Sequence, residues 1–128
     1  MIELVGKLAI IVRSGHGDPG INFVTPSEND LQFSILNHSA GHVIKAHIHK
    51  PRERILTSVQ EVLYIEYGKM TVDLYDNEGR PVGSKLLTKG DVLILLSGGH
   101  GFSFTDNTRV IYTKQGPYYG REEDKRIL

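Results

Sequence analysis

The 128-residue chain has no cysteine, and its longest nearly apolar run is Val92 to Leu96. The absence of cysteine excludes disulfide bonds and thiolate catalysis, so any metal site must use nitrogen and oxygen ligands. The apolar run is far too short to cross a membrane. Residues 1–6 do not combine a basic segment with a following apolar one, so the sequence predicts no secretory signal. We therefore expect a cytoplasmic protein with no membrane partner.

The charge of the chain is balanced. Lysine plus arginine and aspartate plus glutamate each number 15, which gives a formal net charge of zero. A nucleic-acid partner requires a concentrated excess of basic residues, so this balance argues against one. The length and the absence of an internal linker predict a single domain over residues 1–128, large enough to bury a hydrophobic core.

Short apolar segments separated by turn residues dominate the chain, and several of them alternate with polar residues. This pattern is typical of strands in a β-sandwich or barrel, and no window shows the apolar stripe of a helix beyond a short turn within 121–128. The sequence therefore predicts an all-β fold. The clearest predicted strands are Leu8–Val12, Ile21–Val24, Leu31–Leu36, Val43–His49, Glu61–Tyr67, Met70–Leu74, Val82–Thr88, Val92–Leu96, Phe102–Phe104 and Arg109–Lys114.

Two of these strands carry more specific expectations. Glu61 begins a strand whose alternate residues Leu63 and Ile65 are apolar, so the carboxylate shares the face of an apolar row. The pair Gly68-Lys69 that follows is typical of a tight hairpin turn into the next strand. The run Val92 to Leu96 is apolar on both faces, which predicts a central position in a sheet.

Three histidines and one glutamate are the candidate site residues. In the predicted strand Val43–His49, the alternation places His47 and His49 on one face, close enough to share a metal ion. Glu61 could add a carboxylate ligand from a neighbouring strand, and His100, in a glycine-rich turn, a fourth ligand. Each residue also has an ordinary reading, because exposed strands often carry histidine pairs and Glu61 and His100 could be solvated strand-end and turn residues.

The order of these residues resembles the two motifs of the cupin superfamily. Gly41 to Gly68, with His47-x-His49 and Glu61, is similar to the first motif, and Gly90 to His100 is similar to the second. The resemblance covers residues 41–104, about half of the chain, and the flanking strands fit the same architecture. It implies a double-stranded β-helix, the cupin or jelly-roll barrel. It also implies a divalent metal ion (Fe, Mn, Ni or Zn) on His47, His49, Glu61 and His100.

The chain departs from the usual cupin pattern at two places. The spacer Lys50 to Gln60 has eleven residues and is longer than usual. Leu96 stands where the second motif normally has proline, and His100 comes one residue early. We interpret the spacer as a looped-out insertion that leaves Glu61 in the barrel, and we expect it to shape the entrance of the pocket.

A second resemblance, within the cupins, is to sugar-nucleotide ketoisomerases and epimerases. Its residues are His47-Ile48-His49-Lys50, the pair Gln60-Glu61, and the tail Pro117 to Asp124 with two tyrosines and several acids. In that group the histidines act as acid and base without a metal, which would make His47 and His49 catalytic. This resemblance implies a carbohydrate-type small-molecule substrate.

Three functions therefore stay open at the level of sequence. They are a metal-binding cupin enzyme, a metal-independent isomerase or epimerase, and a barrel that binds a small molecule without catalysis. The apolar residues Ile44 and Ile48, on the strand face opposite the histidines, need a covering partner, and small cupins commonly pair. A homodimer is therefore expected.

Overall fold

The computed structural model describes all residues, 1–128, and divides the chain into two compact units. The first, called here the sandwich unit, joins Met1–His16 to Ser58–Leu128. The second, called the inserted unit, is Gly17–Thr57. All ten strands pair in an antiparallel sense, which confirms the all-β prediction. Each unit is described below by itself.

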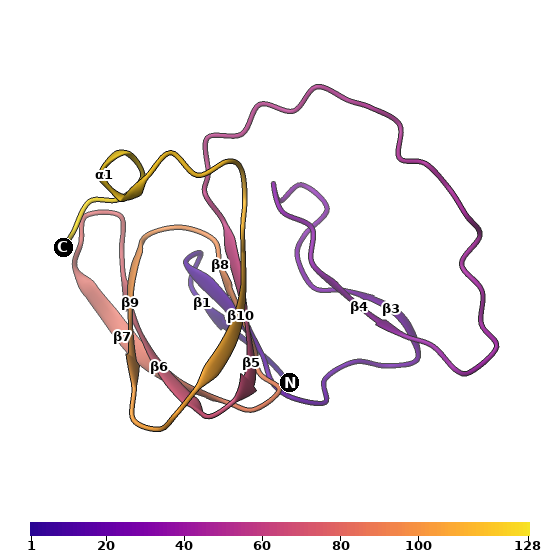
Figure 1. Ribbon diagram of the computed structural model, residues 1–128, viewed down its shortest axis with the longest axis horizontal. Helices are drawn as coiled ribbons and strands as arrows, with labels where there is room; N and C mark the ends of the chain where they lie inside the picture. Colours follow the sequence, from indigo (N-terminus) through magenta and orange to yellow (C-terminus); the bar gives the residue numbers. More distant parts are fainter. The chain divides into compact units, whose positions relative to one another are not determined.

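The sandwich unit contains two antiparallel sheets, which Figure 1 shows as two layers with β7, β6 and β9 on one side and β8, β5 and β10 on the other. The five-stranded sheet has the order β1 (Ile2–Val5), β2 (Ala9–Val12), β8 (Val92–Leu95), β5 (Glu61–Tyr67) and β10 (Arg109–Lys114). The three-stranded sheet has the order β7 (Pro81–Thr88), β6 (Lys69–Tyr75) and β9 (Gly99–Phe104). The helix α1 (Arg121–Asp124) follows, and no helix is long and apolar enough to cross a membrane.

The two sheets share one hydrophobic core. Alternate residues of β6 point into it, since Met70, Val72 and Leu74 are buried whereas their neighbours are not fully buried. Leu63 and Ile65 of β5 meet them from the other sheet. The remaining core residues come from the adjacent strands and are Ala9, Ile11, Leu87, Leu93 and Leu95. The central position predicted for Val92–Leu96 is confirmed, because β8 lies between β2 and β5.

The connection at Gly68 crosses from one sheet to the other, so the predicted hairpin between β5 and β6 is wrong. β5 pairs with β8 and β10, and β6 pairs with β7 and β9. Gly68 has a positive φ of 92° and packs on the backbone at Asn107 and Thr108. Thr108 fastens the crossing, because its Oγ1 accepts a hydrogen bond from the backbone N–H of Lys69 (3.0 Å) and donates to the carbonyl of that residue (3.0 Å).

A buried carboxylate joins the strand ends near another crossing. Asp91, between β7 and β8, accepts hydrogen bonds from the backbone N–H groups of Ser14 and Thr88, both at 2.9 Å. It also pairs with Arg13, whose Nη1 lies 3.0 Å from Asp91 Oδ2 and donates to the backbone carbonyl of Leu86 at 2.8 Å. The ion pair joins the ends of β2 and β8 within the five-stranded sheet, and the hydrogen bonds with Leu86 and Thr88 connect it to β7 of the three-stranded sheet.

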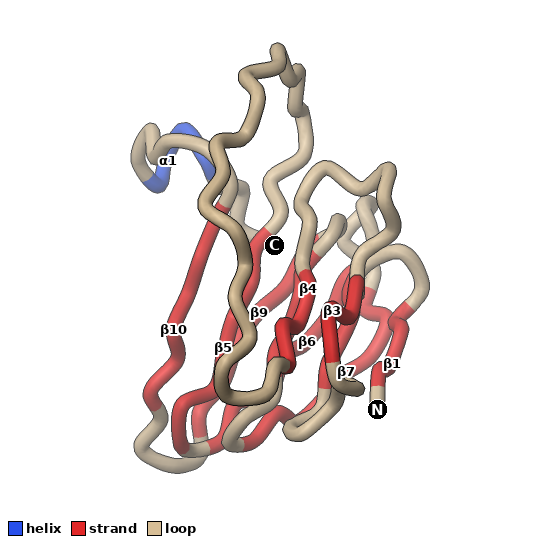
Figure 2. The backbone as a smooth tube through the Cα atoms, turned by 90° about the vertical axis from the view of Figure 1, so that its right-hand side faces the viewer, coloured by secondary structure: helices blue, strands red, loops and turns tan.

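The inserted unit is built on one hairpin. Its strands β3 (Gly20–Phe23) and β4 (Ser34–Asn37) pair in an antiparallel sense, and a long segment without regular structure follows them (Figure 2). The strand predicted at Val43–His49 is absent, because residues 42–60 have no strand partner to accept and donate backbone hydrogen bonds. The side chains that it was expected to bury are exposed, and Ile48 has 91% of its surface accessible.

The other predicted strands match the structure with shifts at their ends. Glu61–Tyr67 and Arg109–Lys114 are β5 and β10 with the expected bounds, whereas Leu31–Leu36 is reduced to Ser34–Asn37. β1 was not among the predicted strands. The closure of these sheets into a cupin barrel and the single-domain organisation stay predictions.

The crossing at Gly68 gives a first prediction. A Cβ at this position would lie 2.5 Å from the carbonyl oxygen of Asn107 and 2.6 Å from Cα of Thr108, at a φ that L-residues rarely adopt. We expect Gly68→Ala to lower the free energy of unfolding by about 2–4 kcal/mol in urea denaturation. Gly83→Ala is the matched control, because a Cβ there meets nothing within 4 Å, and it should change stability by less than about 1 kcal/mol. Equal effects would contradict this account.

The Asp91 network gives a second prediction. Asp91→Ala leaves two backbone N–H groups without their acceptor and removes one of the two carboxylates that pair with Arg13, the other being Glu3. It should cost about 2–4 kcal/mol of unfolding free energy. Asp106→Ala removes a half-exposed carboxylate that lies 3.8 Å from Lys69 and should cost less than about 1 kcal/mol. Urea denaturation measures both. A loss at Asp91 as small as that at Asp106 would show that the network does not hold the sheets together.

Candidate functional site

An open pocket of about 610 Å³ lies at one end of the sandwich unit. Its walls come from the start of β5, the end of β6 with the turn after it, the start of β9, and the tail 124–128. The end of the unit that holds this pocket is called here the open end. Glycines at positions 79, 98, 99 and 101 form part of the wall, so backbone rather than side chains borders much of the space. The pocket is therefore built wholly from the sandwich unit.

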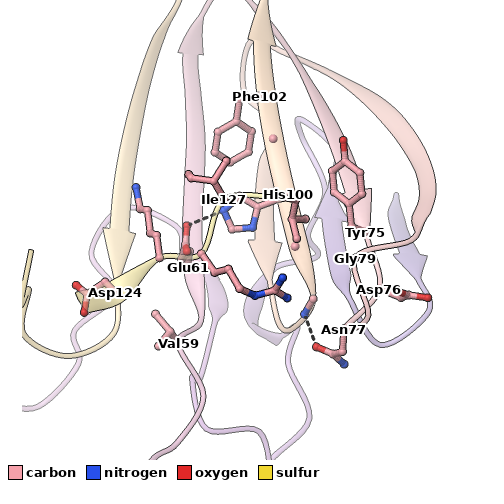
Figure 3. A pocket seen from close by; sticks show the side chains of 16 residues that line it. Val59, Glu61, Tyr75, Asp76, Asn77, Gly79, His100, Phe102, Asp124 and Ile127 are labelled. Carbon is pink, nitrogen blue, oxygen red and sulfur yellow. Dashed lines mark hydrogen bonds and ion pairs between the residues drawn. The ribbon is translucent and has the colours of Figure 1, made fainter. Parts of the chain in front are cut away.

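Glu61 and His100 meet in this pocket from different sheets. Glu61 is the first residue of β5, and His100 is the second residue of β9, where it pairs with Leu74. Figure 3 shows the two side chains pointing toward one another, with His100 Nε2 3.6 Å from Glu61 Oε2. Both side chains are largely buried, with 12% of Glu61 and 26% of His100 exposed. The His100 ring also packs on Phe102, with ring centroids 5.1 Å apart.

Tyr112 is a site residue that the sequence did not indicate. It lies on β10, the strand next to β5, and its phenol forms a hydrogen bond with Glu61. Burial raises the pKa of Tyr112 to about 12, and the charge and hydrogen bond of Glu61 add to the effect. The phenol is therefore protonated at neutral pH and donates to the carboxylate. Its strand was predicted, but the pairing of that strand with β5 was not.

The tail after β10 is tied back to the same strand. Lys114 Nζ lies 3.4 Å from Asp124 Oδ2, and both side chains are mostly buried. The same ammonium lies 4.9 Å from the centroid of the Tyr118 ring, and the backbone N–H of Tyr119 donates to Asp124 at 3.2 Å. Tyr118 and Asp124 therefore hold the tail to β10, beside the pocket.

The other two predicted site residues, His47 and His49, lie in the inserted unit, whose position relative to the sandwich unit is not determined. Their rings meet edge to face with centroids 5.2 Å apart. His47 Nδ1 lies 2.7 Å from the carbonyl oxygen of Lys45, which can only accept, so Nδ1 carries the proton and Nε2 is free. Of the spacer Lys50–Gln60, Val59 lines the pocket.

The predicted ligands thus form two pairs, Glu61 with His100 and His47 with His49. No group of three or more histidine, aspartate or glutamate side chains comes close enough to hold a metal ion. Comparisons with protein-family models, with curated proteins and with solved structures find no match.

The contact of Tyr112 with Glu61 gives a third prediction. In an ultraviolet titration of the folded protein, we expect one tyrosine to ionise near pH 12, and Tyr112→Phe should remove it. Glu61→Gln should lower this pKa toward its ordinary value of 10, because the charge of the carboxylate is lost while the burial remains. Glu66→Gln, on the exposed face of the same strand, is the control and should leave the titration unchanged.

The same group makes stability depend on pH. Because the pKa of Tyr112 is raised in the folded state, its contribution is present below pH 10 and is lost as the pH rises toward 12. Tyr112→Phe should therefore reduce the dependence of the unfolding free energy on pH between pH 10 and pH 12. A parent titration with no tyrosine above the ordinary range, or a Glu61→Gln titration identical to the parent, would contradict the assigned contact.

Proposed function

We propose that the protein is a metal-binding cupin that acts on a small polar or carbohydrate-type metabolite. In this proposal, His47, His49, Glu61 and His100 hold one divalent ion, and the metabolite occupies the pocket at the open end. The observation that carries the proposal is the 3.6 Å contact of Glu61 with His100 inside that pocket. The two residues belong to the two sequence segments that resemble the two cupin motifs, and they are 39 positions apart.

The chemistry of the donor atoms fits such an ion. Three imidazoles and one carboxylate are the nitrogen and oxygen ligands that Fe, Mn, Ni and Zn accept in a chain without cysteine. Glu61 and His100 direct an oxygen and a nitrogen into the same space. His47 keeps Nε2 free through the bond of Nδ1 to a backbone carbonyl, the usual arrangement of a histidine ligand.

When bound, the ion would supply Lewis-acid activation of a substrate or water oxygen. The residues of the chain itself have separate tasks. Tyr112 donates to Glu61 and so fixes the orientation of its carboxylate. Phe102 and Val59 give the pocket apolar wall, whereas Asn77 and the glycine-rich segment offer polar groups to a hydroxyl-rich ligand.

A second candidate function is a metal-independent isomerase or epimerase of the sugar-nucleotide type. The observation that favours it is the closeness of a carboxylate, an imidazole and a protonated phenol in Glu61, His100 and Tyr112. An imidazole titrates near neutral pH and can take or return a proton beside a carboxylate. In this function His47 and His49 serve as acid and base, as in the epimerase-type cupins that the sequence resembles.

Metal content gives a fourth prediction. Protein purified without a histidine tag should carry close to one equivalent of a divalent transition metal, measured by elemental mass spectrometry after Fe, Mn, Ni and Zn are supplied together. The double variant His47→Ala/His49→Ala should lose this metal, because it removes half of the ligands. His100→Ala should lower the affinity for the metal by about 10- to 100-fold. This is the loss typically seen when a residue that hydrogen-bonds to a metal ligand is removed.

His16→Ala is the control, since His16 is outside the proposed ligand set, and it should keep the metal. If the parent protein carries no metal, or if the double variant retains the metal, the metal proposal is wrong. Isomerase or epimerase activity that survives a strong chelator but is lost on His47→Ala/His49→Ala would instead select the second function. If a ligand binds saturably but is not turned over, with or without the chelator, the protein is a binding protein and neither enzyme function holds.

A further inference from the structure

The carboxylates that line the pocket all have donor partners. Glu61 meets His100 and Tyr112. Asp76 pairs with Arg80, whose Nε lies 3.0 Å away, and accepts backbone N–H groups in the turn between β6 and β7. Asp124, the third, is held by the ion pair and backbone bond of the tail described above. The negative charge of the pocket is therefore compensated within the protein.

The cations of the lining are not compensated. Lys125 and Arg126 border the same pocket, and neither forms an ion pair or a side-chain hydrogen bond. Both residues are exposed, so their charged groups are open to a ligand from solution. The pocket thus has two cationic side chains without a partner at its rim, where an anionic group of a ligand could pair with them.

The segment that carries these cations is anchored on both sides. Before them, Asp124 is held by Lys114 through the 3.4 Å ion pair. After them, Leu128 packs on the glycine wall, where a Cβ at Gly99 would lie 2.7 Å from Leu128 Cδ1 and one at Gly79 would lie 3.3 Å from Leu128 Cδ2. Residues 125 and 126 are consequently held at the pocket by contacts that do not involve their own charges.

We propose that Lys125 and Arg126 form an anion-binding subsite at the rim of the pocket, so that the ligand carries a phosphate or carboxylate group. The guanidinium of Arg126 offers a planar pair of donors that matches either anion, and Lys125 adds a second charge. This inference rests on the proposed use of the pocket for a small molecule, but not on the metal. It narrows the substrate class from polar metabolites to anionic ones.

The test titrates inorganic pyrophosphate and, separately, malonate into the metal-free full chain. Binding is measured by calorimetry, and the site is located by the backbone amide resonances of Gly98, Gly99 and Gly101. We expect saturable binding that shifts these resonances. Arg126→Gln and Lys125→Gln should each weaken it, by about twofold to fivefold, as the loss of one exposed charge pair predicts.

Arg121→Gln is the matched control, since it removes the same charge from the same tail at a residue that does not line the pocket. It should change the affinity less than twofold. Binding of pyrophosphate alone would assign the subsite to phosphate, and binding of malonate alone would assign it to carboxylate. No saturable shift with either anion, or an equal loss in Arg121→Gln, would overturn the proposal.

His100→Ala separates this inference from the proposed function. Anion binding that persists in His100→Ala while metal binding is weakened supports the subsite independently of the metal site. If the parent holds no metal but still binds an anion through Arg126, only the metal proposal fails. If the metal is bound as expected but Arg126→Gln leaves anion binding unchanged, only the subsite fails.

Discussion

The network around the buried Asp91 carboxylate is the polar contact that connects the two sheets of the sandwich unit at one end of their shared hydrophobic core. Asp91 is buried, and it collects one guanidinium and two backbone N–H groups at the point where the chain passes from β7 to β8. Removing one member of such a network leaves charges and donors stranded away from water, which costs more than the pair itself contributes. The network therefore specifies how the strand ends meet more than it adds net stability.

Strand register places this network and the pocket at opposite ends of the unit. β5 and β8 are antiparallel, so Tyr64 pairs with Val92 beside Asp91, and Glu61 pairs with Leu95 just before the glycine-rich wall. The crossing at Gly68 and the buried network of Asp91 occupy the first end. The turn after β6, the glycine-rich segment at the start of β9 and the tail 124–128 lie at the second end, around the pocket. The first end therefore serves as framework, and the second end carries the candidate site, where Lys125 and Arg126 face open space.

The sequence pattern predicted the strands well because alternation and apolar runs are local properties. Val92–Leu96 is apolar on both faces, and β8 is accordingly the middle strand of its sheet. The pattern failed where structure depends on distant partners. A glycine followed by a polar residue is common to a hairpin turn and to a sheet crossing, and at Gly68 the pairing of β5 and β6 with different strands tells them apart. The Val43–His49 stretch alternates like a strand but has no partner strand.

The candidate site follows the same division between local and distant information. Glu61 and His100 were paired by the order of two motifs, and the packing of two sheets brings them within 3.6 Å. Tyr112 carries no motif, because its role depends on β10 pairing with β5 in one register. In both candidate functions its task is the same, since a phenol that stays protonated to about pH 12 orients the Glu61 carboxylate either toward an ion or toward an imidazole. The difference between the two functions therefore lies in what Glu61 and His100 share, a metal ion or a proton.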